Sequence, residues 1–252
     1  MSMRQNLPFF LYRRLAGAGL VNCVLRKDDE QIWLSDKYQV ASFQDVFLDP
    51  NYWRAFEIFS EDPDLVVDCG AHCGHFAILI DICFRAKFGA SSAEYILIEP
   101  NEALHPALHS NLVNAKLRDR ATILTGLVGR KKGTATLTTD PKNFLTSHIG
   151  DASGPGKVIE YLDLAVLTGG RPIDLLKLDI EGAEFEFAAA NPDVLALTRN
   201  AVVEVHNHAG TFEDFSRTLL QSGLAQHGPI ITGRDNFMTW FGQGDRSTAR
   251  PA

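Results

Sequence analysis

The chain has 252 residues, of which 45% are hydrophobic, and this is enough to bury one full α/β core. Its 31 acidic residues outnumber 24 basic ones, and the formal net charge of −7 argues against a nucleic-acid partner. No apolar stretch is long enough to span a bilayer, and the four cysteines lack the spacing of a disulfide framework. We therefore expect no membrane partner and a cytoplasmic location.

The first 60 residues mix aromatic and charged side chains without a clean period. We interpret residues 1–60 as an N-terminal extension that packs on the main domain or covers it as a lid, and the segment could equally form a homodimer contact. The turn-rich residues 61–64 mark the start of the main domain, predicted at 61–245. A tail follows at 246–252.

Short apolar runs alternate with helical patterns along the main domain. In chain order, the predicted elements are a strand at 65–67, a loop at 70–74, a helix at 75–88, a strand at 95–98, a helix at 101–117, strands at 121–128 and 134–138, a loop at 139–157, a helix at 162–167, a strand at 173–178, a helix at 181–190, a strand at 201–205, a helix at 212–220, and a hairpin formed by 224–232 and 237–242. This alternation predicts a doubly wound, mostly parallel α/β sheet, and the hairpin predicts one antiparallel edge strand.

The turn after the first predicted strand has the composition of a cofactor-binding loop. Asp68 ends the strand, and Gly70 and Gly74 allow a tight turn and a close approach of the backbone to a ligand. Glu99 ends the next strand, where a carboxylate can accept hydrogen bonds from both hydroxyls of a ribose. The same features fit NAD or another nucleotide. Two residues favour S-adenosylmethionine (SAM) instead. Asp68 would repel a pyrophosphate, and Ala71 stands where the dinucleotide fingerprint has a glycine.

Three sequence blocks in this order resemble the FkbM family of methyltransferases: VDCGAHCG at 67–74, IEPN at 98–101 and LLKLDIEGAE at 175–184. LD at 162–163 and EVH at 204–206 also fit that pattern. The resemblance implies a seven-stranded Rossmann-like sheet, SAM as the methyl donor, and usually O-methyl transfer to a hydroxyl or carboxyl group.

The resemblance covers roughly residues 64–210, and the cysteine and histidine residues in the loop are unusual for the family although its glycines are intact. The predicted cofactor-binding residues are Asp68, Gly70, Ala71, Gly74, Glu99 and Asn101.

Charged residues at the ends of two core strands predict an acceptor site. Lys177 and Asp179 lie two apart and share a face of one strand, and Glu204 and His206 do the same on the next. Because an unpaired buried ion costs several kcal/mol, these groups should pair or line a pocket. We predict Asp179, Glu204 and His206 as catalytic residues, with His206 or Asp179 as the base that deprotonates an alcohol.

Two further residues are predicted to contact the substrate: Glu181, at the start of the helix that follows, and His148, in the loop at 139–157. An alternative is that Lys177, Glu184 and Glu204 form a buried ion-pair network that only braces the strands.

The expected function is a SAM-dependent methyltransferase, with O-methyl transfer to a hydroxyl of a small-molecule or saccharide acceptor. Three alternatives stay open from the sequence. We expect no metal in the site. One alternative is a divalent metal that orients the acceptor and is held by Asp179, Glu204 and His206. The chain could be an NAD- or nucleotide-dependent Rossmann enzyme, or a non-catalytic Rossmann-like binding module.

Overall fold

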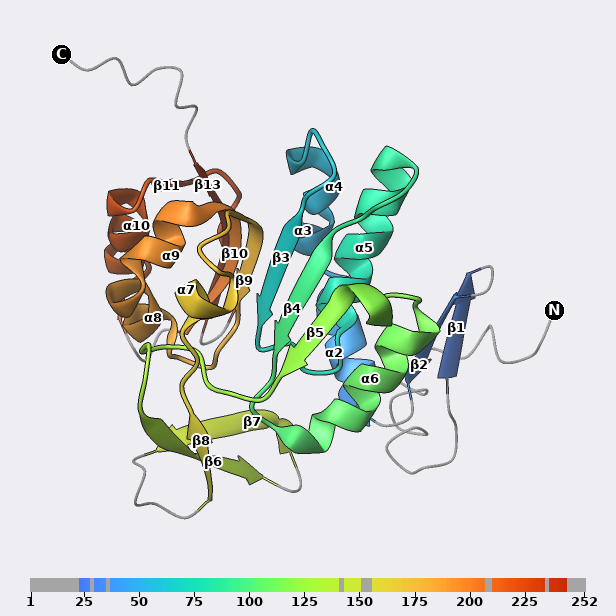
Figure 1. The fold of residues 1–252 in the computed structure, drawn as a ribbon, viewed down its shortest axis with the longest axis horizontal. Coiled ribbons are helices and arrows are strands. Elements are labelled where there is room, and N and C mark those ends of the chain that lie inside the picture. The colour runs from blue at the N-terminus through green and yellow to red at the C-terminus, as the bar shows by residue number, and fades with distance from the viewer. Residues whose placement is uncertain are drawn as a thin grey trace.

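The computed structural model describes residues 23–27, 30–34, 37–140, 143–150, 156–206, 210–233 and 236–243. A mostly parallel central sheet forms the middle layer of a Rossmann-like α/β fold (Figure 1). Its strands, in spatial order, are β11 (Leu224–Gln226), β13 (Asn236–Gln243), β10 (Thr198–His206), β9 (Ile173–Leu178), β3 (Leu65–Cys69), β4 (Glu94–Ile98) and β5 (Ala121–Leu124). The short strand β12 (Ile231–Thr232) pairs with β13 and is the eighth strand of this sheet. The predicted fold class is confirmed.

Five strands, β10, β9, β3, β4 and β5, run parallel to one another. Strand β13 runs antiparallel to β10, as the hairpin prediction requires, but it lies one position in from the edge. The prediction that the antiparallel strand lies at the edge of the sheet is corrected here, because β11 pairs with the other side of β13 and is the edge strand. Residues 224–226 are therefore an outer strand of their own, and the hairpin consists of β12 and β13.

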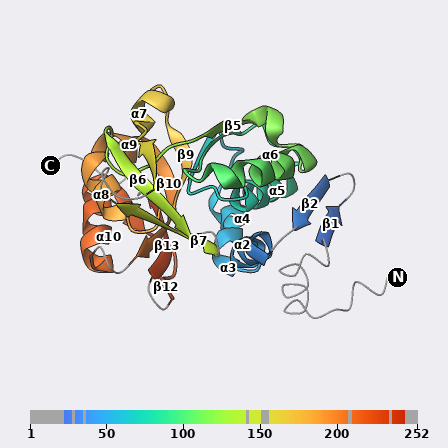
Figure 2. The same ribbon diagram turned by 90° about the horizontal axis from the view of Figure 1, so that it is seen from below.

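Helices cover both faces of the sheet, so the fold is doubly wound (Figures 1 and 2). One face carries α5 (His75–Phe88) and α6 (His105–Asn114), with the short 3-10 helices η2 (Glu102–Leu104) and η3 (Arg118–Arg120) nearby in the chain. The other face carries α7 (Leu164–Leu167), α8 (Glu184–Ala190), α9 (Pro192–Leu197) and α10 (Phe212–Gln221). Each face buries an apolar cluster of its own, with Phe76 and Leu79 in one and Phe187 and Phe215 in the other.

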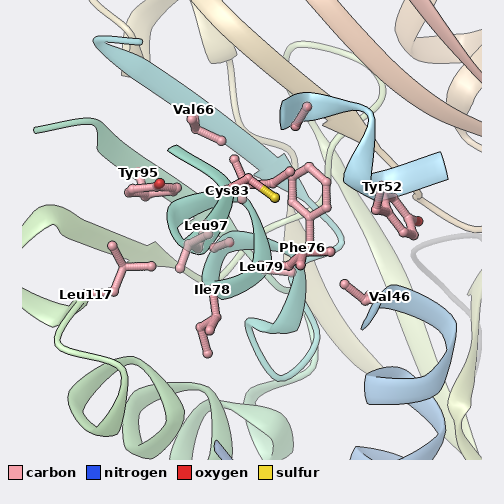
Figure 3. Packing of buried hydrophobic residues seen from close by; sticks show 14 of the residues in the cluster. Val46, Tyr52, Val66, Phe76, Ile78, Leu79, Cys83, Tyr95, Leu97 and Leu117 are labelled. Carbon is pink, nitrogen blue, oxygen red and sulfur yellow. The ribbon is translucent and has the colours of Figure 1, made fainter. Parts of the chain in front are cut away.

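The N-terminal segment contains a hairpin of β1 (Cys23–Lys27) and β2 (Glu30–Leu34), followed by α2 (Lys37–Phe47), α3 (Pro50–Trp53) and α4 (Ala55–Ile58). These helices pack on α5 (Figure 3). The Tyr52 ring meets Phe76 edge to face at 5.4 Å between centroids, and Phe59 meets Phe84 at 5.0 Å. The described part of the segment thus shares the core of the α5 face. The predicted tail at 246–252 lies outside the described residues.

A small second sheet lies between β5 and α7 in the chain. It has the order β7 (Asn143–Gly150), β6 (Thr134–Asp140) and β8 (Lys157–Glu160), and β7 lies next to α2 (Figure 2). The loop prediction for 139–157 was wrong at 143–150, because pairing of the backbone with β6 forms a strand there despite the many Gly, Ser and Thr residues. The side chain of His148, which the sequence analysis assigned to substrate binding, lies outside the described part of the structure.

Helix α5, with 14 residues, is the longest helix in the described ranges. It is too short to cross a bilayer, and no other helix among the described residues is long and apolar enough to do so.

Candidate active site

A cavity of about 850 Å³ lies at the carboxyl ends of β3, β4, β9 and β10, where ligands bind in open α/β sheets. The segment from Ser42 to Tyr52, in α2 and α3, forms one wall, and β13 contributes Asn236 and Met238. Five of the predicted site residues line the cavity: Gly70, Glu99, Asp179, Glu181 and Glu204. Five others are not among the described lining residues: Asp68, Ala71, Gly74, Asn101 and His206.

Glu99 is held by the backbone at the end of β4. Its two oxygens accept hydrogen bonds from the N–H groups of His72 at 2.9 Å and Asn101 at 2.8 Å. His72 has a left-handed backbone with φ of 48°. Each carboxylate oxygen keeps a lone pair for another donor, so the group can accept a pair of hydroxyls. Burial raises the pKa of Glu99 to about 7.

Asn101 positions Glu99 and does not reach the cavity itself. Its side chain accepts a hydrogen bond from the N–H of Ala103 at 3.1 Å and caps η2. Its contact with the predicted cofactor residues is the backbone N–H that it donates to Glu99.

The glycines of the loop allow two close approaches. Gly70 has φ of +83°, and a Cβ atom there would lie 1.9 Å from the carbonyl oxygen of Asp179. Gly74 has φ of +79°, and its Cβ would lie 2.7 Å from a methyl group of Leu108, so this position lets α6 pack close to the start of α5. Ala71 between them is buried in the apolar cluster of the α5 face.

Lys177 ties the cofactor loop to the end of β9. Its Nζ donates to the carbonyl oxygen of Gly70 at 3.0 Å and lies 3.2 Å from Asp179 and 3.4 Å from Asp68. Burial lowers the pKa of Lys177, but the two carboxylates outweigh that effect and raise it above its ordinary value. Asp68 is fully buried behind the loop, so its direct contact is with Lys177.

A left-handed turn separates β9 from α8. Glu181 and Gly182 have φ of 56° and 103°, so the helix predicted from 181 begins only at Glu184. The Glu184 carboxylate accepts hydrogen bonds from the N–H groups of Ile180 and Gly182, both at 3.1 Å, and its Oε1 lies 3.0 Å from Nδ1 of His206. Glu184 therefore braces this turn.

His206 contacts acidic side chains at both ring nitrogens, because its Nε2 lies 3.5 Å from Glu181. Burial lowers its pKa, but the hydrogen bond that its ring donates to Glu184 and the nearby carboxylates raise it to about 9. The raised pKa favours the imidazolium form at neutral pH, which has no free nitrogen lone pair to act as a base.

Glu204 faces the cavity from β10 and accepts a hydrogen bond from the side-chain amide of Asn236. Burial and the nearby Asp179 carboxylate raise its pKa to about 8. Tyr52 of α3 lines the same cavity and is only 3% exposed. The sequence alone indicates no role for Tyr52, because α3 has four residues and a helix that short shows no period.

The residues described above lie within a region that matches a known protein family. The chain matches the Methyltransferase FkbM domain over residues 68–231, which include the cofactor loop, Glu99, Lys177 and His206. The chain belongs to the FkbM methyltransferase family. This result confirms the resemblance drawn from the three sequence blocks.

Among solved structures, the FkbM-family chain is similar in fold to the methyltransferase FkbM from Methylobacillus flagellatus KT, with a TM-score of 0.51 and 12% identity. That match covers 92% of this chain and 58% of the other, so the chain spans little more than half the length of that relative. TrmK of M. capricolum, solved with S-adenosylhomocysteine (SAH), matches with a TM-score of 0.45 and 7% identity over 77% of this chain and 68% of that one. A comparison with curated proteins gives no match.

The FkbM-family site also brings together a set of side chains with the spacing of metal ligands. Atoms of Asp179, Glu181 and His206 all lie within 4.8 Å of one another. A metal at this place would therefore use Glu181 where the sequence alternative named Glu204. The proton on His206 supplies a positive charge between these carboxylates without a metal.

Proposed function

We propose that this methyltransferase transfers the methyl group of SAM to a hydroxyl oxygen of a small molecule or sugar. The observation that carries the proposal is a single cavity lined by Glu99, which follows β4, and by Glu204 and Asp179, which belong to β10 and the end of β9 on the other side of β3. A hydroxyl-binding carboxylate and a candidate base thus face the same space.

The residues around Glu99 fit SAM. Both oxygens of Glu99 are free to accept further donors from the ribose, and the main chain can approach closely at Gly70. The apolar side chains of Ile98, Leu104 and Leu127 flank this end of the cavity and suit an adenine ring. When bound, SAM supplies an electrophilic methyl group on a sulfonium.

The residues at the other end can position and deprotonate an alcohol. Burial and Asp179 raise the pKa of Glu204 to about 8, which makes its carboxylate a stronger base once it is ionised, and Asn236 fixes its orientation. SAM bound at this place would supply the methyl group to the acceptor oxygen, and Glu204 would accept the proton of that hydroxyl. Lys177 fixes the position of Asp179 in the cavity wall, from which Asp179 would orient the acceptor, and positioning supplies much of the rate in such a transfer. Glu204 lines the cavity whereas His206 is not among the described lining residues, which favours Glu204 as the base.

The helices α2 and α3 form the wall of the cavity opposite the sheet, which supports the proposal that the N-terminal segment acts as a lid. The experiment for the function is a turnover assay with SAM labelled in its methyl group and a panel of hydroxylated acceptors, followed by NMR of the product. We expect the label in an O–CH₃ group. A product labelled on nitrogen or carbon would contradict the proposal.

A further inference from the structure

The described walls of the cavity carry more acidic than basic side chains. Six acidic residues line it: Asp45, Asp49, Glu99, Asp179, Glu181 and Glu204. Among the described lining residues there is no lysine or arginine. An acidic excess of this kind in a partly closed space repels anions and attracts cations.

Two basic side chains near these carboxylates, Lys177 and His206, already form ion pairs. Lys177 is divided between Asp68, Asp179 and the carbonyl of Gly70. The His206 ring contacts Glu184 on one side and Glu181 on the other. Neither side chain is among the described lining residues, so the cavity surface keeps its acidic character where an acceptor would sit.

The carboxylates are divided between the two ends of the cavity. Glu99 lies at the proposed ribose position, and Asp49 accepts the N–H of Asn51 at 2.8 Å as the cap of α3. The acceptor is expected beside β9 and β10, where the cavity is lined by Asp179, Glu181 and Glu204. Three carboxylates so close together repel one another unless protons or a bound cation compensate them.

A tyrosine side chain adds a hydrogen-bonding group to the same cavity. Tyr52 lines the cavity and is only 3% exposed, and its hydroxyl group has no hydrogen bond to another residue in the described part of the chain. Figure 3 shows the Tyr52 ring beside Phe76 with its oxygen directed away from that ring. Burial raises the pKa of Tyr52, and the charges of Asp179 and Glu204 raise it further, so the hydroxyl keeps its proton. A ligand in the cavity can therefore accept a hydrogen bond from it.

We propose that the acceptor carries a protonated amine close to the hydroxyl that is methylated, so that its class is an amino alcohol or amino sugar. Asp179 and Glu181 bind the ammonium group, and Tyr52 hydrogen-bonds to an oxygen of the acceptor. This inference rests on the proposed function, because it names the substrate class of the same site.

The ionisation of the site agrees with a cationic ligand. Burial and the neighbouring Asp179 raise the pKa of Glu181 to about 7, and the pKa of Glu204 lies at about 8. A bound ammonium lowers both pKa values, so its binding at pH 7 releases protons. Calorimetry in two buffers of different ionisation enthalpy measures that release.

The test uses wild-type protein saturated with SAH and three matched probes, glucosamine, glucose and N-acetylglucosamine, with 2-aminocyclohexanol and cyclohexanol as a smaller pair. We expect each amine to bind about tenfold or more tightly than its neutral partners, as a charge-assisted hydrogen bond predicts. Sodium chloride should weaken only the amines. Equal binding of a neutral partner, or no binding of any amine, would overturn the inference.

Variants connect the preference to the named residues. Glu181→Gln should remove most of the preference for amines, and Tyr52→Phe should weaken the amines about threefold to tenfold. SAH affinity should stay unchanged in both. The matched control is Glu213→Gln, an exposed carboxylate of α10 that does not line the cavity. Failure of wild-type protein to bind SAH would instead contradict the proposed function, so the two failures are distinguishable.

Discussion

Replacement of Glu99 by Gln tests the cofactor end of the cavity. Both oxygens of Glu99 accept a backbone N–H, from His72 at 2.9 Å and Asn101 at 2.8 Å. The amide of Gln must turn its NH₂ group toward one of these donors, so one buried N–H loses its partner at a cost of about 1–3 kcal/mol in stability. One acceptor for the ribose and the negative charge are lost as well. A hydrogen bond to a charged group contributes about 1.5–3 kcal/mol, which corresponds to roughly 10-fold to 150-fold weaker SAH binding.

The pH dependence sharpens this prediction. Burial raises the pKa of Glu99 to about 7, so the carboxylate is mostly protonated at pH 6 and mostly ionised at pH 8. A ligand that needs the carboxylate should bind about tenfold more tightly to wild-type protein at pH 8 than at pH 6. The Gln variant should lose this dependence, because its amide does not ionise.

Isothermal titration with SAH at both pH values is the assay. Glu94→Gln is the matched control, since Glu94 lies on the same strand, is 59% exposed and pairs with Arg171. Wild-type affinity in Glu99→Gln, or an unchanged wild-type affinity from pH 6 to pH 8, would refute the assignment of Glu99 to the ribose.

Four further outcomes are expected. Gly70→Ala should lower the melting temperature and abolish SAH binding, because its Cβ would lie 1.9 Å from the Asp179 carbonyl oxygen at a φ of +83°; a normal melting curve would contradict this geometry. Lys177→Met should cost about 3–5 kcal/mol in urea unfolding, since it leaves Asp68 charged and buried, and added Asp68→Asn should recover part of the loss. The pH profile of kcat/KM for the acceptor should rise with an apparent pKa near 8, and Glu204→Gln should lower kcat by about 10²–10⁴; a flat profile would exclude Glu204 as the base. Chelation with EDTA should leave turnover unchanged, and a loss restored by Mg²⁺ would instead support a metal at the acidic cluster.

Much of the fold could be predicted because its core strands and main helix have unambiguous patterns. Residues 65–67 are wholly apolar, as a strand buried on both faces requires, and helix α5 has the predicted bounds His75–Phe88. The cofactor loop and Glu99 could be located because they follow two such strands. The chain direction of a parallel sheet then places them at the cavity.

Other features depend on contacts that no local pattern contains. Strand β7 forms because the backbone pairs with β6 and not because its side chains alternate. The wall formed by α2 and α3 arises from packing on α5, so Tyr52 could not be assigned to the site. The brace between Glu184 and His206 requires the left-handed turn at Glu181, a conformation that a residue with a Cβ rarely adopts.

The measurement that tests the central claim most directly is isothermal titration of the purified protein with SAH, with NAD⁺ as the parallel ligand. The account predicts micromolar binding of SAH and no binding of NAD⁺. The Asp68 carboxylate, paired with Lys177, lies behind the loop and would repel a pyrophosphate, whereas Glu99 is the carboxylate that we propose accepts the ribose of SAH. Binding of NAD⁺ without binding of SAH would contradict it.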